Sequence, residues 1–295
     1  MKILHHNDLD GRCAGHVVSL FTNNKNYKED YFECDYTTNL NKIPIQRDEE
    51  VYIVDFSFSK NTYTQFLSLL NKTENVVWID HHASSLDLLK EHPELKKRFK
   101  GLVSNEYSGA ALAYMYFYNK EFNKIPSYIQ YVSDYDTWSF EFGKDTEYFK
   151  LGMDCLNTLV DSDVWDKLDV DSNKDDYGFL SQLVEDGEVI KKYLDAHYKE
   201  QIESDGYEIT IPFNNKSYRA LVLNGHGNSW VFSDKFNSDR YDLYVLWNYS
   251  NNTYNYSLYS NKDRKNYFNV QKLAEKYGGG GHENASGIQS KKRIW

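Results

Sequence analysis

The sequence NVVWIDHH, at residues 75–82, decides the fold. Residues 76–79 form a continuous apolar run, which is typical of a strand buried on both faces of a parallel sheet. VYIVDF, at residues 51–56, has the same character, and an Asp follows the apolar residues in both runs. Sites in open α/β sheets form at the carboxyl ends of the strands. The polar residues that follow these strands are therefore predicted to meet at one edge.

Strand and helix patterns alternate along the first part of the chain, which predicts βαβ units and a parallel sheet with helices on both faces. The Asp- and Asn-rich residues 154–178 are expected to form a long surface excursion, and a long helix is expected to follow it. The expected strands are Lys2–His5, Glu50–Phe56 and Asn75–Asp80. The expected helices are Cys13–Phe21, Thr62–Leu70, Ser108–Tyr118, Pro126–Asp134 and Phe179–Ile202.

The pattern changes after Gly206, where strands become more frequent than helices. We therefore predict an α/β domain at residues 1–178, a linker helix at 179–206 and a smaller α/β domain at 207–295. The strands of the smaller domain are expected at Tyr207–Ile211, Tyr218–Leu223, Asp242–Asn248 and Thr253–Tyr259, and its helices at Trp230–Phe236 and Val270–Tyr277.

The formal net charge of −10 is divided unevenly along the chain. Residues 207–295 hold 12 Lys and Arg against 7 Asp and Glu, a net charge of +5, so residues 1–206 carry −15. Such a division suits one part to hold cations and the other to attract phosphate. Ordinary solvated surface charge is the alternative explanation.

The sequence indicates a cytoplasmic protein. No apolar run reaches the roughly 18 residues that a membrane span needs. The N-terminus has no apolar region typical of a signal peptide. Cys13, Cys34 and Cys155 are scattered and odd in number, which favours reduced thiols over a disulfide framework.

Candidate metal ligands follow the predicted strands. His6, Asp8 and Asp10 are spaced by two in the segment after the first strand, and Asp55 follows the second. Divalent cations prefer carboxylate oxygens, and manganese also accepts imidazole. An Asp in a loop is, however, often a turn former or a helix cap.

Asp80, His81 and His82 follow the third strand, and two adjacent imidazoles after an Asp favour a functional site. Neighbouring side chains point apart on a strand, so one imidazole could bind metal while the other faces a ligand. Asp134 and Asp136 lie near the end of a predicted helix, where carboxylates oppose the helix dipole. Carboxylates at this unfavourable end of a helix favour a metal-binding function.

Four glycines, Gly278–Gly281, precede His282. One glycine could cap the preceding helix, but four exceed that need. Because glycine has no Cβ, the backbone amides of such a run can approach an anion closely. A plain flexible loop is the alternative.

In this order, the segments resemble the motifs of the DHH phosphoesterase superfamily. The run Gly279–Gly281 with His282, Asn284, Ala285 and Gly287 is similar to the GGGHxxAxG signature of the DHH-associated C-terminal domain. The resemblance covers nearly the whole chain. It is strongest to the small two-domain branch of nanoRNases and related nucleotide phosphodiesterases.

The resemblance implies two divalent ions, manganese first, with magnesium or cobalt as alternatives. One ion would be held by His6, Asp8 and Asp55, and the second by Asp10, Asp55, His81 and Asp134. Asp80 would orient an imidazole, and His82 would stabilise charge on the phosphate. The choices between His5 and His6, and between Asp134 and Asp136, stay open.

The resemblance also implies residues that contact the substrate: Gly279, Gly280, Gly281, His282, Asn284, Ser108, Tyr259 and Arg264. The chain departs from its relatives at Tyr259, where they often carry an Arg. Arg264, Lys262 or Lys265 could replace that charge, or Tyr259 could stack on a base.

The implied activity is hydrolysis of short single-stranded oligonucleotides or small nucleotides by water activated between two metal ions. The alternatives are a phosphatase for pyrophosphate, polyphosphate or phosphoadenosine phosphate, and a catalytically silent nucleotide-binding regulatory protein. No membrane partner is expected. The oligomeric state, a homodimer included, stays open.

Overall fold

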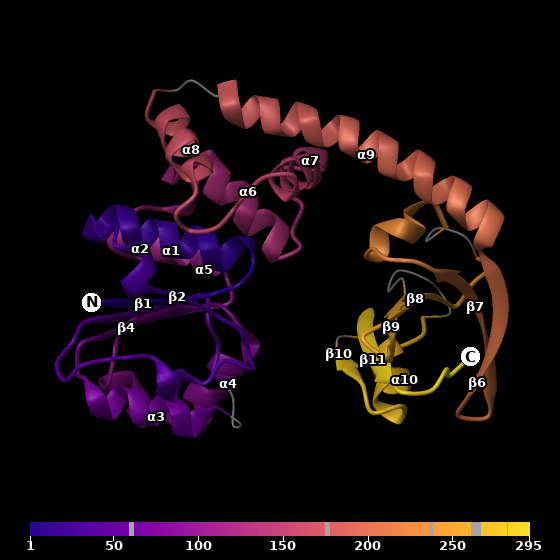
Figure 1. Ribbon diagram of the computed structural model, residues 1–295, viewed down its shortest axis with the longest axis horizontal. Coiled ribbons are helices and arrows are strands. Elements are labelled where there is room, and N and C mark those ends of the chain that lie inside the picture. The colour runs from indigo at the N-terminus through magenta and orange to yellow at the C-terminus, as the bar shows by residue number, and fades with distance from the viewer. Residues whose placement is uncertain (59–61, 175–177, 236–238, 261–266, 282) are drawn as a thin grey trace. The chain divides into compact units, whose positions relative to one another are not determined.

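A computed structural model gives the structure of the chain as two compact units (Figure 1). The units are Met1–Ile190 and Lys191–Trp295, and the boundary falls inside helix α9 (Gly178–Asp205). The division predicted from the sequence, with borders at residues 178 and 206, stays a prediction. The described residues are 1–58, 62–174, 178–235, 239–260, 267–281 and 283–295.

The first unit is built on a five-stranded parallel sheet with the strand order β2-β1-β3-β4-β5. Every residue of β3 and β4 is buried. Burial on both faces explains why their apolar runs are continuous rather than alternating. The predicted α/β class with a parallel sheet is confirmed. The strands are β1 (Lys2–His6), β2 (Tyr31–Cys34), β3 (Val51–Val54), β4 (Val76–Asp80) and β5 (Lys100–Val103).

Helices cover both faces of this sheet, and alternate strand residues enter different cores. Val54 and Ile79 pack in a core shared with α1 and α5, whereas Ile53 and Trp78 pack in a core shared with α3 and α4. Figure 1 shows α1 and α5 on one side of the sheet and α3 on the other. The helices are α1 (Leu9–Thr22), α2 (Tyr27–Asp30), α3 (Tyr63–Lys72), α4 (Ala83–Glu91), α5 (Gly109–Tyr118), α6 (Ser127–Asp136), α7 (Lys144–Asp154) and α8 (Asp163–Lys174), with 3-10 turns at Leu40–Lys42, Pro93–Lys97 and Phe122–Lys124.

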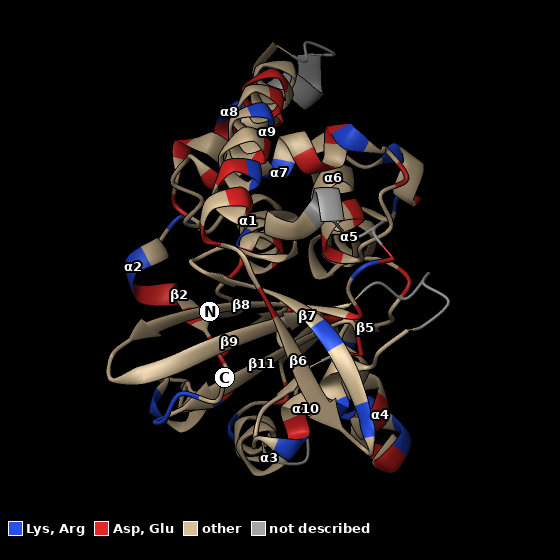
Figure 2. Cartoon of the chain, turned by 90° about the vertical axis from the view of Figure 1, so that its right-hand side faces the viewer, with Lys and Arg blue, Asp and Glu red and all other residues tan. Residues whose placement is uncertain are grey.

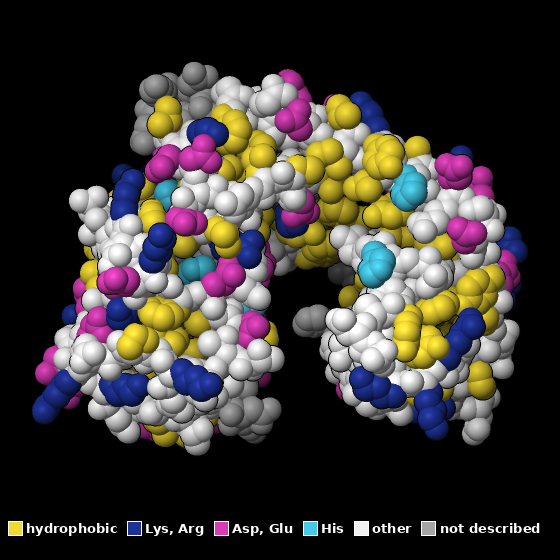
Figure 3. Space-filling view, viewed as in Figure 1, with side chains coloured by type: hydrophobic (Ala, Val, Ile, Leu, Met, Phe, Trp, Pro, Cys, Tyr) yellow, Lys and Arg dark blue, Asp and Glu magenta, His cyan; other side chains and the backbone are white. Residues whose placement is uncertain are grey.

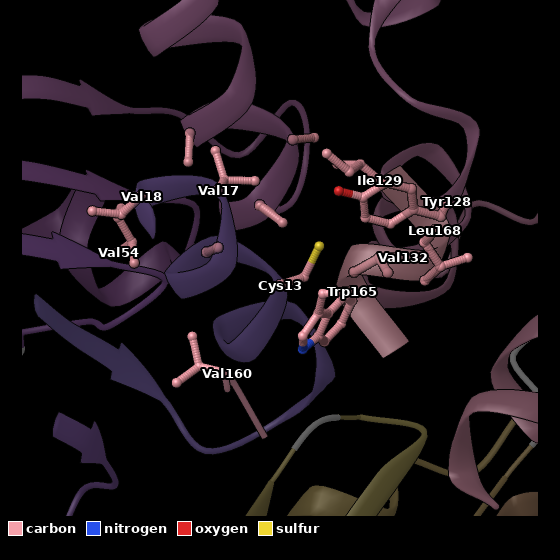
Figure 4. Packing of buried hydrophobic residues seen from close by; sticks show 14 of the residues in the cluster. Cys13, Val17, Val18, Val54, Tyr128, Ile129, Val132, Val160, Trp165 and Leu168 are labelled. Carbon is pink, nitrogen blue, oxygen red and sulfur yellow. The ribbon is translucent and has the colours of Figure 1, made fainter. Parts of the chain in front are cut away.

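The expectation of a long surface excursion at residues 154–178 is wrong, because helix α8 forms there. Val164, Trp165 and Leu168 are buried, and their spacing places them on one face of a helix. The Asp residues that suggested a loop include exposed ones, such as Asp166. In Figure 4 the indole of Trp165 lies in the core of the first unit.

A buried polar network joins α8 to α1 and α6. The Asp169 carboxylate accepts a hydrogen bond from the Tyr128 hydroxyl at 2.7 Å and pairs with His16 Nε2 at 2.7 Å. The His16 ring stacks on Trp165, with ring centroids 5.7 Å apart. Asp8 caps α1 and Asp10 lies in its first turn. By bonding to His16 of α1, helix α8 therefore helps to fix the helix that carries these two predicted ligands.

The long helix α9 exposes two of its hydrophobic side chains, Val189 and Tyr193, which are each 66% exposed. Hydrophobic side chains are visible over this helix in Figure 3. No helix in the described part of the chain combines the length and apolar character that a bilayer span requires.

The second unit contains a six-stranded mixed sheet with the strand order β10-β11-β9-β8-β7-β6, in which β7 and β8 are parallel. One face packs on α10 and the other on the end of α9 and a 3-10 segment, Ser229–Lys235. Its strand β7 carries Lys216 and Arg219 of the predicted basic excess (Figure 2). The elements are β6 (Tyr207–Phe213), β7 (Lys216–Asn224), β8 (Leu243–Ser250), β9 (Thr253–Tyr259), α10 (Val270–Lys276), β10 (Gly280–Gly281) and β11 (Ala285–Ser290).

We expect Trp165→Ala to lower the free energy of unfolding by about 3–5 kcal/mol, because it leaves a large cavity in a packed core. Urea denaturation followed by circular dichroism measures this loss. Val170 on the same helix is 46% exposed, and Val170→Ala is the matched control, with an expected change within about 0.5 kcal/mol. Equal losses in the two variants would show that α8 is not anchored through Trp165.

Candidate functional site

The carboxyl ends of β1, β3 and β4 are neighbours in the sheet, and they bring together the polar residues that follow each strand. Three groups of side chains each place ligand atoms within 4.8 Å of one another. The groups are His6, Asp8 and Asp55; Asp55, His81 and His82; and Asp10, His81 and Asp136. Because Asp55 and His81 each belong to two groups, we treat these seven residues as one acidic cluster.

Asp8 is both the cap of a helix and a member of the cluster. One carboxylate oxygen accepts a hydrogen bond from the Gly11 amide at 2.9 Å and so caps α1. The other accepts from His6 Nδ1 at 2.6 Å. Burial acts to raise the pKa of Asp8, but the hydrogen bonds from His6 and Gly11 outweigh it, and the pKa is lowered.

His6, rather than His5, lies in the cluster. The His5 side chain is buried, and its Nδ1 bonds to the carbonyl oxygen of His6 at 2.9 Å. A Cβ added to Gly15 of α1 would lie 3.1 Å from the His5 ring, so this imidazole packs under the helix. Burial lowers the pKa of His5, as expected for an imidazole kept from solvent.

Asp10 is held by the first turn of α5. Its carboxylate accepts hydrogen bonds from the Ser108 hydroxyl at 2.6 Å, the Gly109 amide at 2.7 Å and the Ala110 amide at 3.0 Å. Amides at a helix N-terminus favour an anion. Ser108 was expected to contact substrate, but its side chain is fully buried and donates to Asp10 instead. Its position therefore gives it a supporting role.

Asp55 is the most constrained carboxylate of the cluster. It is 1% exposed, its backbone φ is 52°, and neither of its oxygens has a hydrogen-bond partner among the described residues. His81 Nε2 lies 3.2 Å from Asp55 Oδ1, and a Cβ added to Gly109 would lie 2.5 Å from Asp55 Cβ. Burial, followed by the charges of Asp10 and Asp8, raises the pKa of Asp55 well above its ordinary value.

The Asp80 carboxylate orients one of the two adjacent imidazoles. Asp80 is fully buried, and one oxygen accepts a hydrogen bond from His82 Nδ1 at 2.7 Å. The proton on Nδ1 leaves Nε2 as the second functional atom of His82. Burial acts to lower the pKa of His82, but the hydrogen bond and charge of Asp80 prevail and raise it.

Asp136, not Asp134, lies in the cluster. The Asp134 carboxylate accepts hydrogen bonds from the Glu141 amide at 2.8 Å, the Phe142 amide at 3.2 Å and the Thr146 hydroxyl. Asp136 Oδ2 lies 3.2 Å from the His81 Nε2 atom. Two residues on a helix differ by about 200° around its axis, so these two carboxylates point in different directions.

Burial and the charge of Asp10 raise the pKa of Asp136 to about 8. Its side chain is 28% exposed, so it lies at the solvent edge of the cluster. The structure thus places His6, Asp8, Asp10, Asp55 and His81 of the predicted ligands together, with Asp136 in the position that was predicted for Asp134.

Four of the predicted substrate contacts, Gly279, Gly280, Gly281 and Asn284, lie in or beside β10 and β11. A Cβ added to Gly279 would lie 2.0 Å from the Gly287 carbonyl oxygen, so close strand approach requires glycine there. Gly280 and Gly281 pair with β11. The Asn284 side-chain oxygen is buried without a hydrogen-bond partner among the described residues.

Tyr259, one of the predicted substrate contacts, is partly buried in the second unit. Its ring centroid lies 6.5 Å from that of Phe232, so the ring packs at the edge of a core cluster. His282, Arg264, Lys262 and Lys265 lie outside the described residues.

Tyr36 is a site residue that the sequence pattern did not indicate. Its ring centroid lies 5.4 Å from that of His6, although the residue is 56% exposed. A single aromatic residue in a loop has no periodicity or motif that would distinguish it from the other tyrosines of the chain.

Comparison with curated proteins gives two relatives, whereas no family model matches the chain. The chain is 24% identical over 274 residues to an uncharacterized protein of Acanthamoeba polyphaga mimivirus, covering 88% of this chain and 58% of that protein. It is 25% identical over 317 residues to oligoribonuclease NrnB of Bacillus subtilis, covering 98% of this chain and 73% of that protein.

Comparison with solved structures shows the fold. The pGpG-specific phosphodiesterase PggH of Vibrio cholerae has a TM-score of 0.54 at 14% identity, covering 98% of this chain and 92% of that chain. An exopolyphosphatase-related protein of Bacteroides fragilis has a TM-score of 0.52 at 12% identity, covering 99% and 88%. The chain therefore has the fold of the DHH phosphoesterases, and the resemblance predicted from the order of its motifs is confirmed.

Proposed function

We propose that the chain is a metal-dependent phosphodiesterase that hydrolyses short oligonucleotides or small nucleotides. The observation that carries the proposal is the Asp55 carboxylate, which is buried beside other carboxylates and has no hydrogen-bond donor among the described residues. A buried charge without a partner is costly unless it is neutralised or binds a cation. The acidic cluster therefore fits divalent cations by both its donor atoms and its unsatisfied oxygens.

Asp55 would be shared between two ions. His6 and Asp8 would complete the ligands of one ion, and Asp10, His81 and Asp136 those of the other, as the three groups suggest. Manganese is the proposed metal, since mixed imidazole and carboxylate donors suit it and a site with oxygen ligands alone would favour magnesium.

The side chains of the chain would prepare the site for attack on phosphorus. When bound, the ions would supply Lewis acidity toward water and the phosphoryl oxygens. The first turn of α5 holds the Asp10 carboxylate in one orientation, and Asp80 does the same for the His82 ring. His82 Nε2 would then donate a hydrogen bond to a phosphoryl oxygen and offset its charge.

The substrate class is supported by the names of two similar proteins. NrnB is an oligoribonuclease, and PggH is a pGpG-specific phosphodiesterase. In the second unit, we propose that Gly279–Gly281, His282 and Asn284 bind phosphate, while Tyr259 or Arg264 takes the place of the Arg found in relatives. The net charge of +5 at residues 207–295 favours such an anionic ligand.

We expect Asp55→Asn to lower the rate of dinucleotide hydrolysis by more than about 100-fold. Loss of a residue that merely orients a metal ligand costs up to about 100-fold, and loss of a ligand shared by two ions should cost more. Manganese at 100 times its Kd should stabilise the wild type by about 2.7 kcal/mol, and the variant should lose most of this gain. Turnover and thermal denaturation, each with and without manganese, measure the two effects.

The matched control for that experiment is Asp87→Asn on α4, since the Asp87 side chain is 67% exposed and pairs with the exposed Lys90 one turn along the same helix. It should leave both manganese stabilisation and turnover near wild-type values. Undiminished turnover in Asp55→Asn would remove Asp55 from the reaction.

A second pair of variants separates the ligand from the structural carboxylate near the end of α6. Asp136→Asn should weaken manganese binding with little loss of stability in the metal-free protein. Asp134→Ala should lower the free energy of unfolding by about 3 kcal/mol, because it leaves two amides and a hydroxyl without their charged acceptor. Calorimetric titration with manganese measures the metal affinity, and urea denaturation measures the stability. Weaker manganese binding in Asp134→Ala, together with lost stability in Asp136→Asn, would show that Asp134 is the metal ligand.

Metal-free protein should lose stability as the pH rises from about 6.5 to 8. Asp136, with a pKa raised to about 8, and His82, with a raised pKa, keep protons in the folded state that the unfolded chain has released. Below about pH 6.5 the lowered pKa of buried His5 acts in the opposite sense. Melting temperatures in chelator across this range test the slope, which Asp136→Asn should reduce. Constant or rising stability would contradict the prediction.

A further inference from the structure

We propose that Tyr36 is a stacking platform for a nucleobase at the edge of the acidic cluster. This role would restrict the site to substrates that carry a base, in contrast to pyrophosphate or polyphosphate. The inference rests on the proposed function and names the chemical group, other than phosphate, that the first unit recognises.

Tyr36 contacts the cluster directly. Its ring is tilted against that of His6, with centroids 5.4 Å apart, and lies nearly parallel to that of Phe56, with centroids 5.9 Å apart and an interplanar angle of 23°. Phe56 follows Asp55 in the sequence and is fully buried. A flat group on the exposed face of Tyr36 would therefore lie close to a phosphate bound to the metal ions that His6 and Asp55 would hold.

Tyr36 forms the exposed end of a row of aromatic rings. Phe56 meets Phe58 edge to face at 5.6 Å, and Phe58 stacks on Phe66 at 4.1 Å. These three phenylalanines are buried, whereas Tyr36 is 56% exposed. In the described part of the chain, His6 and Phe56 account for all the ring contacts of Tyr36. The row therefore ends in a ring with room for one more planar partner.

The backbone around Tyr36 is fixed before any ligand binds. The Asp35 carboxylate accepts hydrogen bonds from the Thr37 amide at 2.8 Å, the Thr37 hydroxyl at 2.7 Å and the Thr38 hydroxyl at 3.0 Å. The Asp35 amide donates to the Thr38 hydroxyl at 2.9 Å. Because this turn is hydrogen-bonded on both sides of Tyr36, the backbone that carries the ring is already ordered. Binding a ligand on the ring therefore costs less conformational entropy.

The hydroxyl of Tyr36 is already engaged within the protein. It accepts a hydrogen bond from the Ser57 hydroxyl at 3.3 Å. Tyrosines usually bury the ring and leave the polar tip in water. The hydrogen bond from Ser57 holds the tip of Tyr36 against the protein, while the residue as a whole stays 56% exposed. A ring face is suited to a base, because every base has a π-face and stacking tolerates any sequence.

The test compares a ligand with a base and one without, neither of which contains a phosphodiester bond. Binding of guanosine monophosphate and of ribose 5-phosphate is measured by calorimetry in manganese with the wild type, Tyr36→Ala and Tyr36→Phe. Stacking contributes roughly 1–3 kcal/mol per base, so Tyr36→Ala should reduce the preference for the nucleotide by about 5- to 150-fold. Tyr36→Phe keeps the ring and should keep the preference.

The KM of a dinucleotide, measured with the same variants, is the second readout and should rise with Tyr36→Ala and not with Tyr36→Phe. Tyr116→Ala is the matched control, since Tyr116 is 40% exposed on α5 of the same unit. An unchanged nucleotide preference and KM in Tyr36→Ala would overturn the proposal. An equal effect of Tyr36→Phe would also overturn it, because the hydroxyl would then be responsible.

Failure of the proposed function gives a different result. If the wild type does not hydrolyse any dinucleotide in manganese, the proposed reaction is refuted. The calorimetric preference for the nucleotide still decides whether Tyr36 stacks a base.

Discussion

The repulsion between buried carboxylates at the end of β1 and β3 is the constraint on which the first unit depends. Asp55 has no hydrogen-bond donor among the described residues, and the charges of Asp10 and Asp8 add to the cost of its ionisation. The metal-free fold can accept this arrangement only by keeping protons on some of these groups. Cations remove the same cost while leaving every carboxylate ionised. The carboxylate repulsion that destabilises the metal-free fold therefore also favours the metal binding that the proposed reaction needs.

Two helix N-termini make this concentration of charge tolerable. Asp8 caps α1, and Asp10 accepts from two backbone amides at the start of α5. The partial positive charge of each helix end lies where the carboxylates gather. Glycine is needed for such close approach, since a Cβ on Gly11 would lie 2.4 Å from the His6 carbonyl oxygen and one on Gly109 would meet Asp55.

The sequence predicted the features that depend on strand ends and could not predict those that depend on side-chain partners. Continuous apolar runs predicted β3 and β4, and the polar residues after them do meet at one edge. The same reasoning missed β2, in which only Tyr31 and Cys34 are buried, and β5, in which no residue is buried, because neither strand has a continuous apolar run. It also missed α8, because Val164, Trp165 and Leu168 are scattered among many Asp and Asn residues, which are typical of a loop.

Within the site, motif order located the cluster but could not give the contacts of its individual side chains. Ser108 lies near the cluster as expected, but only the structure shows that its hydroxyl is used by Asp10. Asp134 and Asp136 are equivalent in the sequence, and which of them faces His81 depends on how far α6 extends. Tyr36 belongs to no motif, and its position depends on a turn and a buried Phe56 that are distant in sequence.

Counting hydrogen-bond donors separates the carboxylates that shape the site from those that are left for a ligand. Asp134 is surrounded by donors from the loop that follows α6, so its charge is already used in folding. Both oxygens of Asp10 accept hydrogen bonds from the start of α5, and one of them lies 3.8 Å from His81 Nε2. Among the described residues no hydrogen bond is donated to Asp55, which belongs to two of the three groups that make up the cluster. A carboxyl group accepts at about four positions, so a buried one with none filled retains its full capacity for a cation. This ordering follows from local contacts alone, and it places Asp55 at the centre of the proposed site, with Asp10 beside it and Asp134 outside.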